Sequence, residues 1–397
     1  MNGIVRRCGK DDIKSFIDLS GYAYSIPDSS FENFREKWDD IHNEIFLNEV
    51  DGIPVATARM IPLIQNIRGT MKNMGGIGLV AGSPEYRRKG YVRDLMFKML
   101  EDIRDKDYAV SCLYPFKDSF YSAMGYVKLP PTKKLEFDPV SLRGISRPDG
   151  YSVTRESGDD AFRIWRTLHE EMVKSTHGAA GRRDIRWLEY TRKFTRKIAV
   201  ARNSDNKAEG VLVYSIKGYG EGHDWSEPGE ISIGSMLWSS LAGRDSLLHF
   251  IYGHSDQIKK VKLMVTPHNE DYYQWLTDYH TPTISSNIIA MARIVDVEKS
   301  FNGIKLDSSG SIILEVTDSH LDWNNGTFEL HNQNGELSVS HSQEEARVMF
   351  TIEGLTATLY GTLDDSQLRR LGWLSGEKPT KLYEWFPMAI PWLSESF

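Results

Sequence analysis

Cysteine is almost missing from this sequence, since the 397 residues contain only Cys8 and Cys112. Two cysteines cannot form the disulfide framework of a secreted protein, and their spacing does not match a zinc site. Long apolar runs are missing too. The opening MNGIVRRCGK lacks an apolar stretch behind its basic residues, and no segment approaches the roughly 18 apolar residues that a membrane span requires. We therefore expect a cytoplasmic protein without a metal and without a membrane segment.

Basic residues are also outnumbered, because 48 Lys and Arg stand against 55 Asp and Glu and give a formal net charge of −7. This charge argues against nucleic acid as the main partner and is compatible with cationic small molecules. The apolar share of 40% and the charged share of 26% are typical of globular proteins. The length predicts two or three domains with cores of their own.

The first part of the chain alternates between apolar and polar residues as a sheet does. Residues 44–50 and 54–63 read as a hairpin around Asp51-Gly52, and a third strand is expected over 77–82. A helix is expected from about Tyr91 to Lys106, because its apolar residues form one stripe at helical spacing: Leu95, Met96, Met99, Leu100 and Ile103. A strand over 109–116 and a short helix from Asp118 follow.

The same order returns about 150 residues later, which indicates an internal repeat. Strands are expected over 197–203, 209–218, 231–238 and 261–267, a helix over about 245–259, and a short helix over 271–276. The two copies differ between the third strand and its helix, where SPEYRRKG (83–90) of the first copy is replaced by SSLAGRD (239–245). The repeat predicts two domains of one fold, of which only the first keeps a basic glycine turn. The glycine-rich stretch 177–184 is expected to be a loop, because no strand leads into it.

After about residue 291 the pattern changes to short alternating runs with Asn-Gly turn signals, at 311–316, 327–332, 336–340 and 347–354. We expect a third, α+β domain here, which makes the chain a mixed α/β (α+β) protein. The predicted divisions are 1–147, 148–290 and 291–397. The chain ends in an apolar segment over 386–397 that contains two prolines.

Arg87-Arg88-Lys89-Gly90 is the strongest chemical signal, because it stands after a strand and at the start of an amphipathic helix. The first turn of a helix has unpaired N–H groups and the positive end of the helix dipole, so it can bind phosphates. Gly90 permits a close backbone approach, and the arginines add charge-assisted hydrogen bonds. The alternative is a solvated basic face at a helix start.

VAGSPEYRRKGYVRDLMFKML (80–100) resembles the acetyl-CoA segment of the Gcn5-related N-acetyltransferases (GNAT), whose loop has the form Arg/Gln-x-x-Gly-x-Gly/Ala. Arg87, Arg88 and Gly90 match the anion-binding part, whereas Arg93 departs from the small residue of the last position. FYSAMGY (120–126) is similar to the Phe-Tyr-x-x-x-Gly-Phe/Tyr segment of the same superfamily.

The whole chain also resembles one branch of that superfamily, the enhanced intracellular survival (Eis) acetyltransferases, in residues 75–96, 113–126 and 291–301 and in its length. The resemblance implies an active GNAT domain, a degenerate second one and a C-terminal domain like the sterol carrier proteins. It implies acetylation of amines, often of aminoglycosides, with acetyl-CoA as the co-substrate, and assembly into hexamers.

The resemblance also implies roles for individual residues. Tyr121 occupies the position of the general acid, although it could instead be a core aromatic, and Tyr126 is the rival phenol. The α-carboxylate of Phe397 would be the base, although an apolar tail with a solvated carboxylate is the alternative. The CoA site would comprise twelve residues: Val80, Ala81, Gly82, Arg87, Arg88, Lys89, Gly90, Tyr91, Val92, Arg93, Phe116 and Lys117.

Other candidates have simpler interpretations. Cys112 is expected to be a small buried residue rather than a catalytic thiol, and His268 a structural histidine. Asp28, Glu32 and Glu395 could favour polyamino substrates, but most carboxylates of an acidic chain face solvent.

Three functions remain open at this point. The first is acetyl-CoA-dependent N-acetylation of small polyamines, and the second is acetylation of protein or cell-wall amines. The third is an apolar-ligand-binding protein in which the transferase domains are a scaffold. Retention of Arg87, Arg88, Gly90 and Tyr121 together favours an enzyme.

Overall fold

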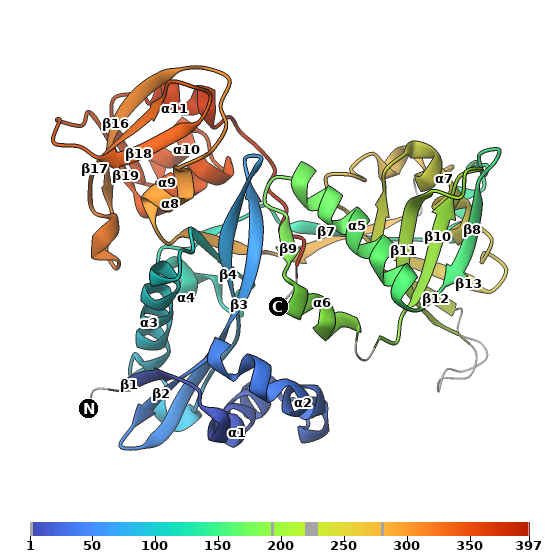
Figure 1. Ribbon diagram of the computed structural model, residues 1–397, viewed down its shortest axis with the longest axis horizontal. Coiled ribbons are helices and arrows are strands. Elements are labelled where there is room, and N and C mark those ends of the chain that lie inside the picture. Colours follow the sequence, from blue (N-terminus) through green and yellow to red (C-terminus); the bar gives the residue numbers. More distant parts are fainter. Residues whose placement is uncertain (1–2, 192–193, 219–228, 279–281, 396) are drawn as a thin grey trace. The chain divides into compact units, whose positions relative to one another are not determined.

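The computed structural model describes residues 3–191, 194–218, 229–278, 282–395 and 397. The chain forms two compact units, which we describe separately. Met1–Pro130, His177–Ala180 and Ile289–Phe397 make up the first unit, and Pro131–Thr176 and Gly181–Ile288 make up the second (Figure 1). Among the described residues, no helix combines the length and the apolar character that crossing a bilayer would need.

The larger sheet of the first unit is mixed, with the strand order β1-β2-β3-β4-β5-β15-β6. Its strands are β1 Ile4–Arg7, β2 Ile45–Val50, β3 Ile53–Ile67, β4 Thr70–Gly82, β5 Val110–Leu113, β6 Val127–Lys128 and β15 Met291–Ile294, and a short strand β9, Ala180–Arg182, pairs with β3 outside this order. The predicted hairpin around Asp51-Gly52 is confirmed, since both turn residues have positive φ (52° and 78°), as a tight two-residue turn requires. The strand predicted over 77–82 is only the end of β4, because a second turn at Arg68-Gly69 lets β3 and β4 pair from Thr70 onward.

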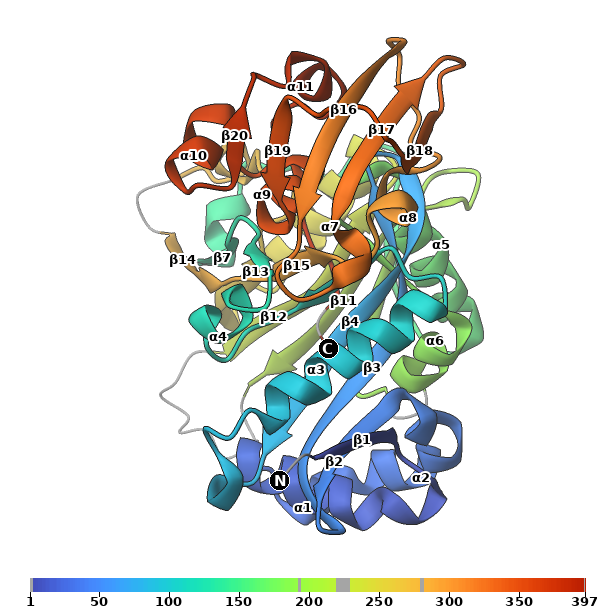
Figure 2. The same cartoon turned by 90° about the vertical axis from the view of Figure 1, so that its left-hand side faces the viewer.

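The segments that connect these strands contain four helices: α1 Ile13–Tyr24, α2 Glu32–Ile41, α3 Tyr91–Asp105 and α4 Asp118–Ser122. They also contain the 3-10 turns η1 Lys10–Asp12, η2 Asp28–Phe31, η3 His42–Glu44 and η4 Pro84–Tyr86. Helix α3 matches its prediction, and its apolar stripe is fully buried. Figure 2 shows α3 lying along β3 and β4, against which it packs. Helices α1 and α2 lie in a stretch for which no element was predicted.

The second unit is built on a sheet with the order β14-β7-β13-β12-β11-β10-β8. Its strands are β7 Thr132–Phe137, β8 Ser152–Glu156, β10 Lys197–Arg202, β11 Ala208–Lys217, β12 Gly229–Trp238, β13 Ile258–Met264 and β14 Thr283–Ile288. Its helices are α5 Asp159–Ser175, α6 Asp184–Thr191 and α7 Leu241–Tyr252, with η5 Pro139–Leu142 and η6 Tyr272–Gln274.

The expected repeat of elements is present in the second unit, with three corrections. The helix expected over 245–259 begins earlier, at Leu241, because Ser240 caps its first turn, and it ends at Tyr252. The following strand therefore starts at Ile258 rather than at 261. The last short helix is a 3-10 turn, and 177–184 is a connection between α5 and α6 that contains β9.

Each of the two large sheets contains one strand from a segment that the predicted divisions assign to another domain. Strand β7 follows β6 in the chain but pairs with β13 and β14, and β15 follows β14 but pairs with β5 and β6. The divisions at 147/148 and 290/291 stay a prediction about the linear organisation of the chain.

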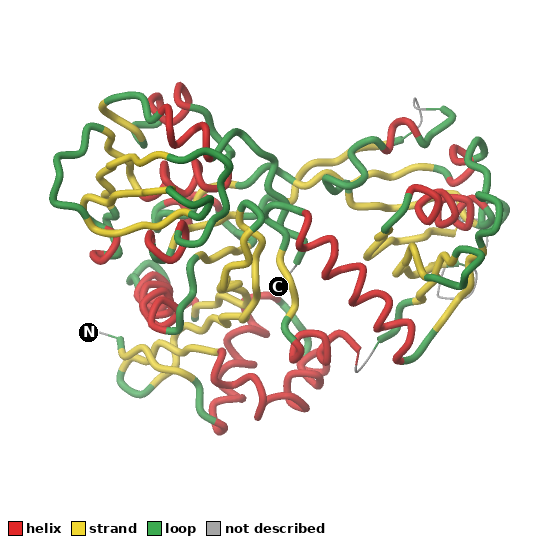
Figure 3. Tube along the Cα trace, turned by 45° about the horizontal axis from the view of Figure 1, so that its top comes forward, coloured by secondary structure: helices red, strands yellow, loops and turns green. Residues whose placement is uncertain are grey.

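The smaller sheet of the first unit has the order β18-β17-β16-β19-β20. Its elements are β16 Gly310–Thr317, η7 Asp322–Asn324, β17 Gly326–Asn332, β18 Leu337–His341, β19 Val348–Thr351 and β20 Leu374–Gly376, with helices α8 Val297–Phe301, α9 Ile352–Tyr360, α10 Asp365–Arg370 and α11 Thr380–Trp385. The strand expected over 347–354 ends at Thr351, whose hydroxyl caps α9. Figure 3 shows helices beside each of the three sheets.

Candidate active site

Strands β4 and β5 separate at the point where the candidate site begins. They pair in parallel from Met74 opposite Val110 to Ile77 opposite Leu113, where β5 ends while β4 continues to Gly82. The pairing of β4 with β3 shifts register next to this point, and Leu79 has a φ of +52°. This is a β-bulge, which re-aims the backbone. The edge of β4 after Ile77 is therefore left without β5 and can bond a ligand through main-chain groups.

The turn between β4 and α3 presents the start of a helix without a side-chain cap. Arg88 and Gly90 have positive φ (63° and 90°), and Gly90 is the N-cap of α3 with no side-chain hydrogen bond to the first turn. A side chain at position 90 would be strained by this φ and would meet the Arg93 guanidinium at 3.1 Å. The first N–H groups of α3 are thus available to an anion, as the sequence predicts.

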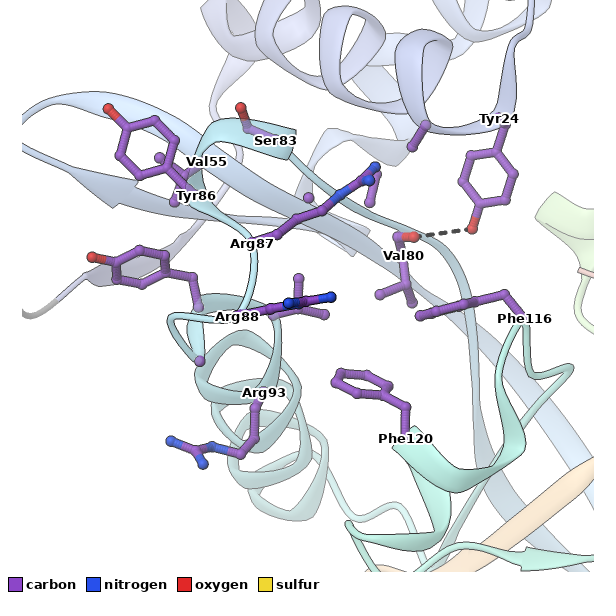
Figure 4. A pocket seen from close by; sticks show the side chains of 16 residues that line it. Tyr24, Val55, Val80, Ser83, Tyr86, Arg87, Arg88, Arg93, Phe116 and Phe120 are labelled. Carbon is purple, nitrogen blue, oxygen red and sulfur yellow. Dashed lines mark hydrogen bonds between the residues drawn. The ribbon is translucent and has the colours of Figure 1, made fainter.

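A pocket of about 600 Å³ lies between these elements (Figure 4). Ten of the twelve predicted CoA-site residues line it: Val80, Ala81, Gly82, Arg87, Arg88, Gly90, Tyr91, Val92, Arg93 and Phe116. In Figure 4 the guanidinium ends of Arg87 and Arg88 extend over the pocket, whereas Arg93 points away from them. The lining thus combines a basic end with an apolar middle, which fits a ligand that has phosphates at one end and an apolar arm.

The structure places the other two predicted residues at the margin. Lys89 is exposed, with its Nζ 5.0 Å from the centre of the Tyr86 ring, and exposed Lys117 is the N-cap of α4. Neither lines the pocket.

Helix α1 also contributes to this pocket, which was not predicted. Tyr24, at the end of α1, donates a hydrogen bond to the carbonyl oxygen of Val80 at 3.1 Å (Figure 4). Ala23, Val55, Ser83, Tyr86 and Phe120 are the remaining lining residues that were not predicted. The apolar spacing of residues 13–20 could have indicated a helix, but no local pattern shows that its end contacts β4.

Tyr121 lies on α4 behind the pocket wall rather than in it. It is 2% exposed, and its ring packs against Phe116 and Phe120 at centroid distances of 5.6 and 5.1 Å. Burial, and secondarily the neighbouring Tyr24 and Tyr126, raise the pKa of Tyr121 well above its ordinary value. The phenol is therefore held in its protonated form, which is the form that a proton donor needs.

Tyr126, the rival phenol, has a fixed partner. Its hydroxyl lies 2.8 Å from the hydroxyl of Ser111, and both side chains are buried. Burial raises the pKa of Tyr126 as well. This pairing accounts for its hydroxyl structurally.

The C-terminal tail ends against β4. A Cβ placed on Gly78 would lie 3.0 Å from the carboxyl carbon of Phe397 and 3.2 Å from an oxygen, so the terminal carboxylate contacts the strand directly after the β4–β5 pairing ends. The Phe397 ring packs on Tyr114 at a centroid distance of 5.7 Å. The chain end is thus docked in the same strand segment that leads into the pocket.

Comparisons with known proteins agree with this geometry. Residues 4–128 and 178–294 match family models described as acetyltransferase (GNAT) domains, and residues 297–394 match a sterol carrier protein domain. An N-acetyltransferase of Streptomyces avermitilis, itself uncharacterized, is 23% identical over 290 residues, which are 68% of each chain. The chain contains two GNAT acetyltransferase domains.

Solved structures show the same fold over the full length of the chain. A GCN5-related N-acetyltransferase from Anabaena variabilis has a TM-score of 0.87 at 21% identity, with 100% of both chains covered. Eis1 from Mycobacterium abscessus has a TM-score of 0.78 at 16% identity, with 99% of this chain and 100% of that chain covered. These structures agree in fold with the family models, which confirm the tandem GNAT domains and the C-terminal sterol carrier domain predicted from the sequence. The family models and the curated relatives identify the protein as an N-acetyltransferase.

The second GNAT domain has lost the open helix start. The Ser240 hydroxyl accepts from Gly243 N–H at 3.0 Å and donates to the Glu209 carboxylate at 2.7 Å, and Tyr151 donates to the same carboxylate at 2.5 Å. The hydroxyls of Tyr151 and Ser240 lower the pKa of Glu209, so it is ionised at neutral pH. In this GNAT domain the Ser240 hydroxyl caps the start of α7, and a carboxylate of the chain itself bonds that hydroxyl.

The remaining candidates have structural partners. Cys112 is fully buried, its Sγ lies 3.6 Å from Gln65 Oε1, and burial raises the pKa of its thiol to about 12. His268 lies 2.6 Å from the Thr176 hydroxyl, and burial lowers its pKa.

The acidic candidates for substrate binding are not free. Arg35 pairs with Asp28 at 2.6 Å and with Glu32 at 3.0 Å, and Glu395 is 1% exposed. Within the described part of the chain, no group of three His, Cys, Asp or Glu side chains could hold a metal ion.

Proposed function

We propose that this protein transfers the acetyl group of acetyl-CoA directly to a primary amine of a polyamino, aminoglycoside-like molecule. One observation carries the proposal: a single segment of β4 runs from the docked terminal carboxylate at Gly78 to the pocket and the open start of α3. A donor site and a group able to receive a proton therefore lie on the same strand, a few residues apart.

The pocket has the chemistry that binding of CoA requires. Arg87, Arg88 and the first N–H groups of α3 would hold the diphosphate. Main-chain groups of Val80, Ala81 and Gly82 would bond the pantetheine amides, while Phe116 and Phe120 supply an apolar wall. Bound there, acetyl-CoA supplies a thioester, whose acetyl group is the one transferred.

Tyr121 is proposed as the general acid. Its buried phenol is protonated at neutral pH, which is the form from which a proton can be given to the departing thiolate of CoA, and its raised pKa makes it a weaker acid than free tyrosine. The rings of Phe116 and Phe120 pack on Tyr121 and keep it away from bulk water, so the phenol stays protonated until the donor is bound.

The carboxylate of Phe397 is proposed as the proton acceptor. An ordinary terminal carboxylate has a pKa of about 3.5 and is a weak base. It would therefore hold the ammonium form of the substrate beside β4 and receive its proton directly or through a water molecule as the amine attacks. A positively charged polyamine suits such a site, because further ammonium groups add attraction to a chain with a net charge of −7.

Assembly into a hexamer remains part of this proposal on the basis of the resemblance to the Eis branch, and a cytoplasmic location on the basis of the two cysteines alone. The mass of the purified full-length protein, measured by light scattering, would test the hexamer.

The proposal is tested by measuring CoA release with a thiol reagent while acetyl-CoA is mixed with neomycin, kanamycin or a lysine-containing peptide. We expect turnover with the aminoglycosides exceeding that with the peptide. Deletion of Phe397, or extension of the chain by one glycine, should reduce turnover at least about 100-fold, the scale of a lost general base, while acetyl-CoA binding is retained. A glycine added at the N-terminus is the matched control.

Two results would contradict the proposal. Full activity of the protein extended at its C-terminus would remove the carboxylate from the mechanism. Absence of turnover with every amine, together with tight binding of a lipid, would favour the alternative in which the sterol carrier domain binds an apolar ligand and the GNAT domains are a scaffold.

A further inference from the structure

Phe397 contacts one face of β4 at Gly76 and Gly78, two residues without side chains that we call the glycine strip. Alternate residues of a strand face the same side, so Gly76 and Gly78 share one face of the sheet. A Cβ built on Gly76 would lie 3.1 Å from both Cε1 and Cζ of the Phe397 ring, and one built on Gly78 would lie 3.0 Å from the carboxyl carbon. Both distances are closer than ordinary contacts between carbon atoms. The space that Phe397 occupies exists because these two positions are glycine.

We propose that Gly76 and Gly78 are positioning residues that fix the terminal carboxylate for catalysis, Gly76 by seating the ring and Gly78 by seating the carboxyl group. This inference rests on the proposed role of the carboxylate. It assigns a function to two glycines that precede the CoA-binding segment and that make no contact with the pocket described above.

The rest of the tail is anchored before it reaches the strip. The Pro387 carbonyl accepts from the Arg68 guanidinium at 2.7 Å, Trp392 N–H donates to the His177 carbonyl at 3.0 Å, and the Ser394 hydroxyl bonds both main-chain groups of Ala180 at 2.9 and 3.0 Å. These bonds fix the path of the tail as far as Ser394. The terminal residue itself is placed by its fit on β4 and by the Tyr114 ring.

The strip lies where a small displacement has a large effect. Ile77 is the last residue of β4 that pairs with β5, and the bulge at Leu79 follows. Gly78 therefore stands at the opening between the strands, next to the Val80–Gly82 segment proposed for the donor. Proton transfer requires hydrogen-bond reach, so a shift of the carboxylate by a fraction of an ångström lowers turnover.

The first test measures docking without using the reaction. Carboxypeptidase A releases C-terminal aromatic and aliphatic residues, and a docked Phe397 is protected from it. Carboxypeptidase A should release Phe397 from the folded full-length Gly76→Ala and Gly78→Ala variants about tenfold faster than from wild type. This ratio corresponds to a loss of roughly 1.4 kcal/mol of docking free energy. Gly75→Ala is the matched control, because its Cβ would face Ile103 and Met60 instead of the tail. We expect its release rate to equal that of wild type.

The second test is a rescue that distinguishes the two glycines. An alanine at position 76 would meet Cε1 and Cζ of Phe397 at 3.1 Å and Leu63 Cδ1 at 3.2 Å. Leucine lacks the two ring atoms, so Phe397→Leu should restore most of the docking and kcat lost in Gly76→Ala, measured against Phe397→Leu alone. The same change should not restore Gly78→Ala, whose added methyl meets the carboxyl group that every C-terminal residue carries. Each unrescued variant should lose about tenfold in kcat with an unchanged KM for acetyl-CoA.

The outcomes separate this inference from the proposed function. Unchanged release of Phe397 in both alanine variants, or equal failure of rescue at positions 76 and 78, would overturn the positioning role. The wild-type protein could acetylate no amine while the variants show the expected release of Phe397 and the expected rescue of docking. This result would contradict the proposed function but would still support the docking of Phe397 on the two glycines.

Discussion

The two GNAT domains of this chain treat the same structural feature, a helix that starts beside two separating parallel strands, in opposite ways. Helix α3 begins at Gly90, which offers no capping side chain, and exposed Arg87 and Arg88 precede it. Helix α7 begins at Ser240, which caps the first turn and bonds the ionised Glu209. The first helix start is open to an external anion, and the second already has an internal one.

The difference shows how little must change to remove a phosphate site from a shared fold. The N-terminus of any helix stabilises negative charge, whether the charge is a ligand or a side chain. Once Glu209 bonds the Ser240 cap of α7, a diphosphate there would face a carboxylate instead of two guanidinium groups. The element order of the two domains is similar, so we expect the chemistry of a few loop residues to decide which domain binds the donor.

The largest expected effect is that of replacing Tyr121 in the first GNAT domain, compared with replacing an exposed tyrosine in the second unit. Tyr121→Phe should lower kcat by about 100-fold or more, the usual contribution of general acid catalysis, because the phenol that protonates the thiolate is lost. Acetyl-CoA affinity should stay within about twofold by calorimetry, since Tyr121 lies behind the pocket wall. Tyr273→Phe, at an exposed position of η6 in the second unit, should leave both quantities unchanged.

The pH profile sharpens this prediction. Because the pKa of Tyr121 is raised, its proton is retained beyond the ordinary phenol value of about 10. The wild-type rate should therefore show no alkaline loss attributable to Tyr121 below that pH. Equal losses of kcat and of acetyl-CoA affinity in Tyr121→Phe would indicate a packing role instead.

The next effect tests the two helix starts directly. Arg87→Ala combined with Arg88→Ala should weaken acetyl-CoA binding about 100-fold, which corresponds to roughly 1.4 kcal/mol for each lost charge-assisted hydrogen bond. Arg244→Ala, at the start of α7, should not change the affinity, because Arg244 is engaged by Asp245 and Asp271 at 2.8 and 3.2 Å. Titration calorimetry at one fixed salt concentration measures both. A loss of affinity with Arg244→Ala would assign donor binding to the second domain.

The sequence was sufficient for those parts of the molecule that local patterns encode. The stripe of α3 predicted that helix almost to the residue, and the replacement of SPEYRRKG by SSLAGRD indicated that the two domains differ at the helix start. The candidate anion-binding loop could be proposed because its glycine and arginines are adjacent in the chain. These signals depend on neighbours within one turn or one hairpin.

The parts that were missed depend on contacts between distant residues. The hydrogen bond from Tyr24 to Val80 joins residues that are 56 positions apart. The sequence predicts which segments are strands, but it does not predict that β7 pairs with β13 and that β15 pairs with β5. The resemblance implied a catalytic carboxylate at Phe397, but its contact with β4 was not predicted, because no spacing links a chain end to two glycines more than 300 residues earlier.

The smallest expected effect concerns the internal anion of the second domain. Glu209→Gln should lower the melting temperature by about 2–4 °C at neutral pH, because the helix start loses its negative charge and the hydrogen bonds from Tyr151 and Ser240 weaken. The folded pKa of Glu209 is depressed below its ordinary value of 4.5, so the stabilisation is present above that value and is lost as the pH falls through the folded pKa. Calorimetric scans of wild type and variant should therefore differ at pH 7 and converge in acid, whereas Asp205→Asn, at an exposed turn, should show no difference at either pH. The Glu209→Gln variant should still bind one acetyl-CoA per chain, since α7 would lack the counterparts of Arg87, Arg88 and the uncapped Gly90. Binding of a second acetyl-CoA by this variant would show that the carboxylate alone had closed the site.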